Sequence, residues 1–150
     1  MKVEIKQDPK TQSVFVEIHC REVTPEVARL ERHVRRFGTS LSATENGERF
    51  NIPIDSILYI ESVDKRTFIY TDSQTLMSEK RLYELEEILD PRDFFRCAKS
   101  TILHLNKVER LKPEITRNIL ATLVNGERVV VSRRYAPELK KLLGIGKQEE

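Results

Sequence analysis

Three short stretches of the chain place cationic side chains where they would project from a fold instead of entering its core. Lys65-Arg66, Lys99 and Arg133-Arg134 each stand at or near a predicted turn or strand end. The arginine guanidinium can bond O6 and N7 of a guanine together, and lysine reaches the same atoms. Both side chains also neutralise phosphate. These side chains could together recognise an anionic polymer. For any one of them, a solvent-exposed charge without a function is the simpler interpretation.

Catalytic and metal-binding arrangements find little support in the residues. Cys97 and His104 are separated by what reads as extended chain, and His19 and Cys20 on one strand would point to opposite faces. Neither cysteine has a CxxC or CxxH spacing, so no zinc site is predicted. No glycine-rich phosphate loop is present. We therefore expect no enzyme, no cofactor, no metal and no small-molecule substrate.

The composition is that of a soluble globular chain. It has 150 residues, of which 39% are hydrophobic and 33% charged, which suggests one domain with a small appendage. No apolar run approaches the ~20 residues of a membrane span, and the first ten residues lack the apolar stretch of a signal peptide. We expect a cytoplasmic protein with free thiols. Cys97 is interpreted as a small buried hydrophobe, with a redox role left open.

The charge is distributed unevenly along the chain. Residues 1–90 hold thirteen Lys and Arg against seventeen Asp and Glu, whereas residues 91–143 hold twelve against five. The net charges are thus −4 and +7, within an overall +2. A basic half in a nearly neutral protein suggests an anionic partner. The alternative is a solvated surface that neighbouring acids balance.

The N-terminal part predicts a hairpin and a helix. Residues 2–6 and 13–18 alternate apolar and polar side chains around a turn-forming stretch, as the strands of an antiparallel hairpin do. Thr24 followed by Pro25 starts a helix that runs to Phe37 and closes at Gly38. Its apolar stripe needs a partner, so we expect packing or dimerisation. Residues 38–49 are polar and read as a linker, which predicts an extension at 1–45 and a domain at 46–150.

The remainder predicts a mostly β protein with minor α content. Short strands are expected at 50–53, 56–61, 67–71 and 74–77, then a helix within 78–89 with four inward side chains: Leu82, Leu85, Ile88 and Leu89. The segments 119–124 and 128–131 form a hairpin through Asn125-Gly126, expected as a type I′ turn. A final helix spans 137–143. A helix-turn-helix reader would need packed consecutive helices, and the basic half does not offer them.

Residues from about 51 to 145 resemble the LytTR DNA-binding family. The resemblance rests on pieces in a fixed order: IPIDSILYIES, RLYELEEIL, FFRCAKSTILHLNKVERL and LVNGERVVVSRRYAPELKKLLGI. It covers about two-thirds of the chain. It implies an elongated stack of small antiparallel sheets, here preceded by the hairpin and helix, that binds DNA through loops.

The resemblance also nominates site residues and shows departures. Three segments would approach the duplex, and their DNA-binding residues are Lys65, Arg66, Thr67, Lys99, Ser100, Arg133 and Arg134. Many relatives carry His then Arg or Asn before the serine of the second segment, where this chain has Ala98-Lys99. His104 stands where an asparagine is common. A changed operator is therefore expected. Arg96 is predicted to have a structural role, holding a carboxylate or carbonyl.

The resemblance implies a sequence-specific regulator of transcription that binds double-stranded DNA as a homodimer. The residues before the domain do not look like a receiver domain, so the chain is similar to the small stand-alone subset, which is often paired with a restraining membrane protein. A β-rich protein-interaction module with a basic face is the alternative. A single-stranded binder is disfavoured because exposed aromatics do not interleave with the basic residues.

Overall fold

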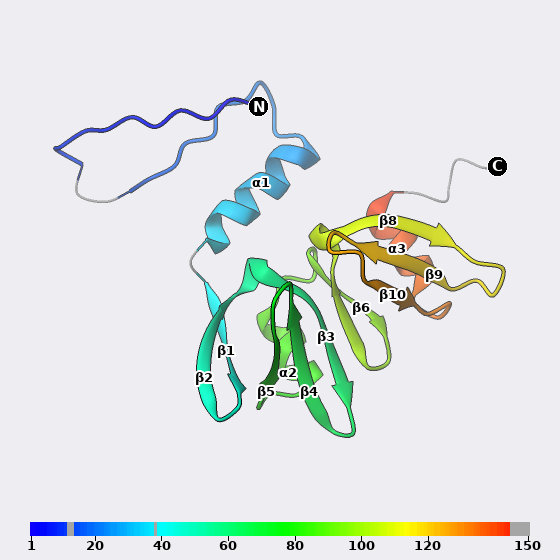
Figure 1. Ribbon diagram of the computed structural model, residues 1–150. Helices are drawn as coiled ribbons and strands as arrows, with labels where there is room; N and C mark the ends of the chain where they lie inside the picture. The colour runs from blue at the N-terminus through cyan, green and yellow to red at the C-terminus, as the bar shows by residue number, and fades with distance from the viewer. Residues whose placement is uncertain (12–13, 38, 145–150) are drawn as a thin grey trace. The chain divides into compact units, whose positions relative to one another are not determined.

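A computed structural model describes residues 1–11, 14–37 and 39–144, and the chain divides into two units, Met1–Phe37 and Gly38–Glu150 (Figure 1). In the first unit the predicted helix is present as α1, Pro25–Arg36. The hydroxyl of Thr24 accepts a hydrogen bond from the Val27 backbone N–H at 3.3 Å, which caps the helix start. The predicted closing residue, Gly38, lies outside the described residues.

The predicted N-terminal hairpin is not formed. A turn is present where Asp8 accepts backbone hydrogen bonds, but none of the described residues before Pro25 belongs to a strand. Val3, Ile5 and Val14 are each at least 80% exposed. A two-stranded ribbon with no apolar layer beneath it is marginal in water, so the alternating pattern alone does not form a sheet.

The second unit begins with a hairpin where we expected a linker. Strands β1 (Ser40–Glu45) and β2 (Glu48–Pro53) pair along their length, and β1 also pairs with β5 (Thr75–Ser78). Asn46 and Gly47 supply the two positive φ angles of the turn, and the side chain of Leu41 is buried. The linker prediction is therefore wrong, and the division between the units follows Phe37 instead of residue 45.

Two antiparallel sheets make up this unit. The larger has the strand order β2-β1-β5-β4-β3-β7-β6, and the smaller has the order β10-β9-β8. Their remaining strands are β3 Ile57–Val63, β4 Arg66–Thr71, β6 Phe94–Ala98, β7 Thr101–His104, β8 Val108–Pro113, β9 Ile119–Leu123 and β10 Arg128–Val131. Single turns of 3₁₀ helix precede β3 and β8, at Ile54–Ser56 and Leu105–Lys107. The mostly β fold class is confirmed.

Each face of the large sheet packs against a different layer. On one face α2 (Leu82–Ile88) buries Leu82 and Leu85 against strand residues such as Ile60. On the other, Leu58 and Phe95 pack against the small sheet and α3 (Ala136–Leu143). The helix at 78–89 is thus confirmed with one correction. Ile88 is 50% exposed, whereas Leu89, the residue that follows the helix, is buried in the same core as Leu82 and Leu85.

The hairpin of β9 and β10 is confirmed, but its turn differs from the expected type. Only Gly126 has a positive φ, at 91°, so the two left-handed residues of a type I′ turn are missing. The Gly126 N–H bonds to the Leu123 carbonyl, and the Leu123 N–H bonds to the Glu127 carbonyl. The loop is a three-residue connection that ends in one left-handed residue. The final helix ends as predicted, at Gly144 with φ 69°.

Candidate nucleic-acid interface

The first predicted segment is the tight turn between β3 and β4. Val63 pairs with Arg66, which leaves Asp64 and Lys65 as a two-residue loop with φ angles of 50° and 65°. These are the values of a type I′ turn. Lys65 and Arg66 are exposed, as an interface requires. Thr67 is only 4% exposed, because the alternation of β4 turns it toward the sheet interior, so its prediction as a DNA contact is corrected.

The second segment is the turn between β6 and β7, where Lys99 and Ser100 are both exposed. The guanidinium of Arg96 donates from Nε to the carbonyls of Ala98 and Lys99, at 3.0 and 3.2 Å. It also forms an ion pair with Glu86 of α2. The predicted structural role of Arg96 is therefore confirmed. The planar guanidinium holds the turn to the helix beneath it.

The third segment is a turn between β10 and α3. Strand β10 ends at Val131. Arg133 and Arg134 lie in the turn that follows, and both are exposed. The Arg134 guanidinium lies 5.8 Å from the ring centroid of Tyr135. Tyr135 packs against the core between the large sheet, the small sheet and α3. Its ring is therefore fixed and can orient the Arg134 guanidinium.

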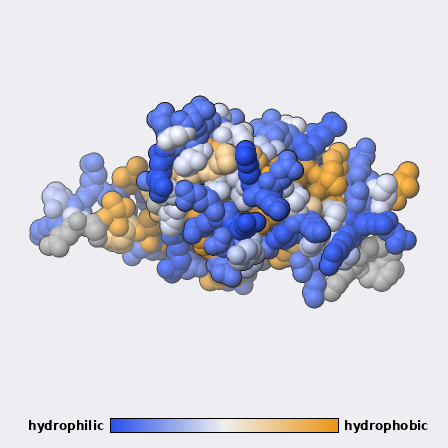
Figure 2. Space-filling view, turned by 90° about the horizontal axis from the view of Figure 1, so that it is seen from below, coloured by the Kyte–Doolittle hydropathy of each residue, from blue (hydrophilic) through white to orange (hydrophobic). Residues whose placement is uncertain are grey.

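Hydrogen bonds tie the three turns together. The Ser62 N–H, at the end of β3, donates to the Ser100 carbonyl at 2.8 Å. The Ser132 N–H donates to the Cys97 carbonyl at 2.9 Å. The β3–β4 and β6–β7 turns point to one side of the large sheet (Figure 1), and the surface seen from that side is mostly hydrophilic (Figure 2). Residues 65, 99 and 134, far apart in sequence, thus share one side of the unit.

Two tyrosine hydroxyls donate hydrogen bonds to carboxylates of this unit. The Tyr59 hydroxyl donates to Glu127 at 3.0 Å, and the Tyr70 hydroxyl donates to Glu61 at 3.2 Å. The two rings are stacked with centroids 4.4 Å apart. Burial and then the nearby carboxylates raise the pKa of both phenols. Both hydroxyls therefore keep their protons, and the bond from β3 to Glu127 links the two sheets.

Cys97 and His104 face different cores and cannot act together. Cys97 is fully buried in the core beneath the small sheet, and burial raises the pKa of its thiol to about 12. His104 stacks on Phe94 of the other core, with centroids 4.2 Å apart. Its Nδ1 lies 2.6 Å from the Ile57 carbonyl, which can only accept. Burial lowers the pKa of this imidazole, so it is neutral with the proton on Nδ1.

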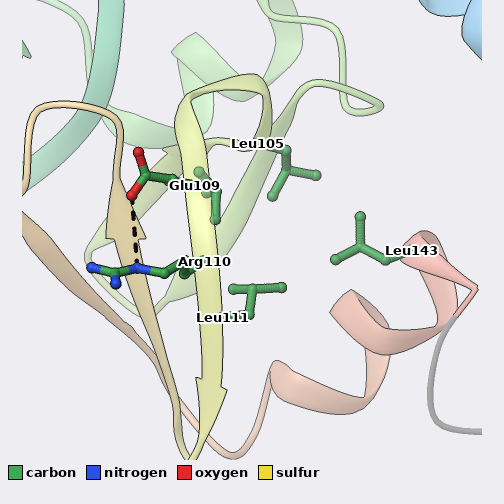
Figure 3. Close-up of a pocket in the computed structure, with 6 residues that line it drawn as sticks. Leu105, Glu109, Arg110, Leu111 and Leu143 are labelled. Carbon is green, nitrogen blue, oxygen red and sulfur yellow. Dashed lines mark ion pairs between the residues drawn. The ribbon is translucent and has the colours of Figure 1, made fainter.

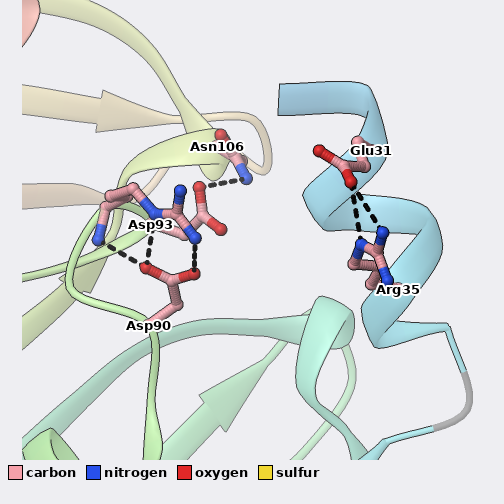
Figure 4. A network of polar contacts seen from close by, with 6 residues as sticks. Glu31, Arg35, Asp90, Asp93 and Asn106 are labelled. Carbon is pink, nitrogen blue, oxygen red and sulfur yellow. Dashed lines mark hydrogen bonds and ion pairs between the residues drawn. The ribbon is translucent and has the colours of Figure 1, made fainter. Parts of the chain in front are cut away.

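The pocket and the polar contacts elsewhere in the structure do not include the predicted DNA-binding residues. An apolar hollow is lined by Leu105, Val108, Leu111 and Leu143, with one surface ion pair between Glu109 and Arg110 (Figure 3). Figure 4 shows polar contacts within each unit, including the Asp90–Arg92 pair and the bond from Asn106 to Asp93. Within residues 1–11, 14–37 and 39–144 no cluster of metal-ligating side chains occurs. No described helix is long and apolar enough to span a bilayer.

One positioning residue escaped the sequence interpretation. The Asn118 side-chain carbonyl accepts a hydrogen bond from the Arg133 N–H at 2.8 Å. It joins the turn before β9 to the turn that carries Arg133 and Arg134. An asparagine beside a predicted strand was a weak signal, because its partner lies fifteen residues away.

Comparisons with known proteins agree with this geometry. The family model of the LytTr DNA-binding domain matches residues 47–144. The LytTr DNA-binding domain of a Bacillus cereus protein superposes with a TM-score of 0.69 at 30% identity, covering 71% of this chain and 98% of that domain.

Full-length relatives are similar over the same region. The "Transcriptional regulatory protein YpdB" of Escherichia coli K12 is 32% identical over 113 residues, 75% of this chain and 46% of that protein. The Bacillus anthracis "Sensory transduction protein LytT" is 33% identical over 94 residues, 63% of this chain and 38% of its own length. The chain thus spans less than half of these relatives.

One further relative matches along almost its whole length. The Staphylococcus aureus protein named "Uncharacterized HTH-type transcriptional regulator SAS2254" is 26% identical over 147 residues, 97% of this chain and 99% of that protein. The two-sheet fold, the side formed by its turns and the family match over residues 47–144 together show that this chain belongs to the LytTr DNA-binding domain family.

Proposed function

We propose that this chain is a sequence-specific transcription regulator of bacterial type that binds double-stranded DNA in the cytoplasm, and that it has no catalytic activity. The observation that carries the proposal is the gathering of three cationic turns on one side of the second unit by tertiary hydrogen bonds. The family match supports the choice of DNA over an acidic protein as the partner.

In this proposal the turns have different tasks. Arg134 leaves a rigid sheet through a short turn and is oriented by Tyr135, so its planar fork can meet a guanine edge in the major groove. Lys65, Arg66 and Lys99 are exposed point or fork charges that set the register on the phosphates. Ser100 and Arg133 add hydrogen-bond donors beside them.

We further propose that two copies bind together through α1. The side chains of Val27, Leu30 and Val34 share one stripe of this helix, and none of its residues is buried. Replacing Leu30 by Asp would place a charge in that stripe and should yield a monomer by sedimentation. An unchanged mass would contradict dimerisation through this helix. A restraining membrane protein is proposed from the family resemblance alone.

The test of the function is binding to the DNA upstream of the protein's own gene, with a scrambled duplex as competitor and several salt concentrations. Arg134→Ala should compress the ratio of the two affinities by roughly 1–3 kcal/mol, since a base contact discriminates between sequences. Lys140→Ala, on α3, should weaken both duplexes equally or neither. Equal affinity of the unmodified protein for the two duplexes would contradict sequence-specific binding.

A further inference from the structure

The row of three turns continues into a fourth. Asn118, which accepts the Arg133 N–H at 2.8 Å, is the first residue after the tip of the β8–β9 turn. Successive hydrogen bonds thus join the end of β3 to the β6–β7 turn, the end of β6 to the β10–α3 turn, and the β10–α3 turn to the β8–β9 turn. The β8–β9 turn is the next element along the same series.

The tip of this turn holds an arginine in a backbone conformation that favours glycine. The Glu114 N–H bonds to the Asn118 carbonyl and the Arg117 N–H to the Glu114 carbonyl, which leaves a three-residue loop. Arg117 is its last residue, with φ 74°. Side chains other than glycine, asparagine and aspartate rarely occupy this region, because Cβ crowds the following carbonyl. A strained residue of this kind points to a use for its side chain.

The other hairpin of the same sheet provides the matched case. The β9–β10 loop has the same two backbone hydrogen bonds and the same left-handed last residue, but there it is Gly126 with φ 91°. A Cβ at Gly126 would meet nothing within 4 Å. Space is therefore not the reason for glycine at that position, and the conformation alone accounts for it. The β8–β9 loop has Arg117 at the equivalent position, so it keeps the backbone strain and exposes a guanidinium.

The surroundings of Arg117 suit a phosphate. Its side chain is exposed, and Lys112 on the adjoining strand is exposed as well. Glu114 is the acidic residue that flanks the loop, and among the described residues it forms no ion pair with Arg117. The neighbouring turn contributes Arg133 and Arg134. Phosphate contacts need only a reachable cation, whereas base contacts need a rigidly aimed one.

We propose that the β8–β9 turn is a fourth DNA-contacting segment, in which Arg117 binds a backbone phosphate of the duplex beyond the bases that the other three turns reach. The inference rests on the proposed function and extends it to a residue outside the three segments nominated by the family resemblance. The contact carries charge without base preference, so it lengthens the bound site at one flank.

The test uses the full chain with Arg117→Gly, which removes the charge and suits the left-handed backbone, so the fold is retained. Binding is measured on the upstream duplex and on a scrambled duplex across a salt series. We expect a loss of about three- to tenfold on both duplexes at low salt and a salt slope lower by about one ion. Arg117→Lys, which keeps the charge, should restore most of the affinity.

Arg128→Ala is the matched control, because Arg128 is exposed on the same sheet at the end away from this turn, opposite Thr122. It should leave the affinity and the salt slope unchanged. Wild-type affinity for Arg117→Gly overturns the inference, as does an equal loss for Arg128→Ala. A wild-type protein that does not distinguish the two duplexes contradicts the proposed function instead, so the two failures are separable.

Discussion

The second unit contains two pairs of turns that share a backbone conformation and differ in the type of residue at the last position. The two-residue turns of β1–β2 and β3–β4 both have two positive φ angles, with Gly47 at the second position of one and Lys65 at that of the other. The three-residue turns of β9–β10 and β8–β9 end in Gly126 and Arg117. In each pair one member has the residue that the conformation favours and the other has a cation.

The cationic members are the turns that belong to the hydrogen-bonded series on one side of the unit. The turns at Gly47 and Gly126 lie outside that series, and conformational ease accounts for the glycine in each. At Lys65 and Arg117 an L side chain in the left-handed region costs of order 1–2 kcal/mol. We propose that the exposed charge, used to bind DNA, offsets this cost in stability. The difference separates turns that close a hairpin from turns that present a side chain.

Removing the Arg96 side chain, which holds the β6–β7 turn, should have the largest effect on stability. Arg96→Ala deletes the bonds to the carbonyls of the β6–β7 turn and leaves Glu86 without its ion pair. Hydrogen bonds to a charged group contribute about 1.5–3 kcal/mol, and we expect a loss of that size in the free energy of unfolding, together with weaker DNA binding. Urea denaturation measures it.

Arg96→Lys should recover little of this loss, because an ammonium cannot reach both carbonyls and the carboxylate in one plane. Arg49→Ala is the control, since the Arg49 pair with Glu79 is 4.0 Å long and exposed, where such pairs contribute about 0–1 kcal/mol. Equal losses for Arg96→Ala and Arg49→Ala would show that the clamp on the turn contributes nothing.

The next largest effect on stability should come from placing a cation at the left-handed glycine of the β9–β10 or the β1–β2 turn. Gly126→Arg and Gly47→Lys each place an L side chain at φ 91° and 80° with open space around Cβ. We expect each to lower the free energy of unfolding by about 1–2 kcal/mol through backbone strain alone. Thermal melts would detect the change. Unchanged melting temperatures would mean that these glycines do not reflect conformational preference.

The reverse exchange should move stability and binding in opposite directions. Lys65→Gly relieves the left-handed residue of the β3–β4 turn, so the free energy of unfolding should rise by up to about 1 kcal/mol. DNA affinity should fall several-fold, with a salt slope smaller by about one ion. Melts and salt-dependent binding on one preparation test both. A gain in stability without a loss in affinity would remove this turn from the interface.

The smallest effect concerns the end of β7 away from the turns. His104 is buried and neutral with its pKa lowered by desolvation, and its Nε2 has no hydrogen-bond partner among the described residues. The unfolded chain binds its proton near the ordinary pKa of about 6.5, so the folded state holds fewer protons below that pH. Stability is therefore full above about pH 6.5 and falls as the pH decreases.

Melting temperatures at pH 7.5 and 5.5 measure this dependence, and His104→Asn, which cannot titrate, should show a smaller decrease. DNA affinity at pH 7.5 should be the same in both proteins, because residue 104 is at the opposite end of β7 from Ser100. An identical acid response of the two proteins would assign the proton uptake to other groups.

Local signals in the sequence determined the elements that rely on local chemistry. Thr24-Pro25 starts α1, Asn125-Gly126 turns β9 into β10, and Gly144 ends α3. The order of the family pieces identified the DNA-binding class. The approach turns at Lys65 and Lys99 followed from that resemblance, and the structure exposes both residues on the same side of the unit.

The tertiary structure decided which of the strand-like sequence patterns form strands and which side chains are buried. Residues 2–6 and 14–18 alternate like strands but have no layer to cover, whereas residues 40–45, which we interpreted as part of a linker, form β1 between β2 and β5. Thr67 is buried although Lys65 and Arg66 just before it are exposed. The hydrogen bond from Arg133 to Asn118 joins turns fifteen residues apart. Pairing partners and burial depend on distant segments, and no local pattern contains them.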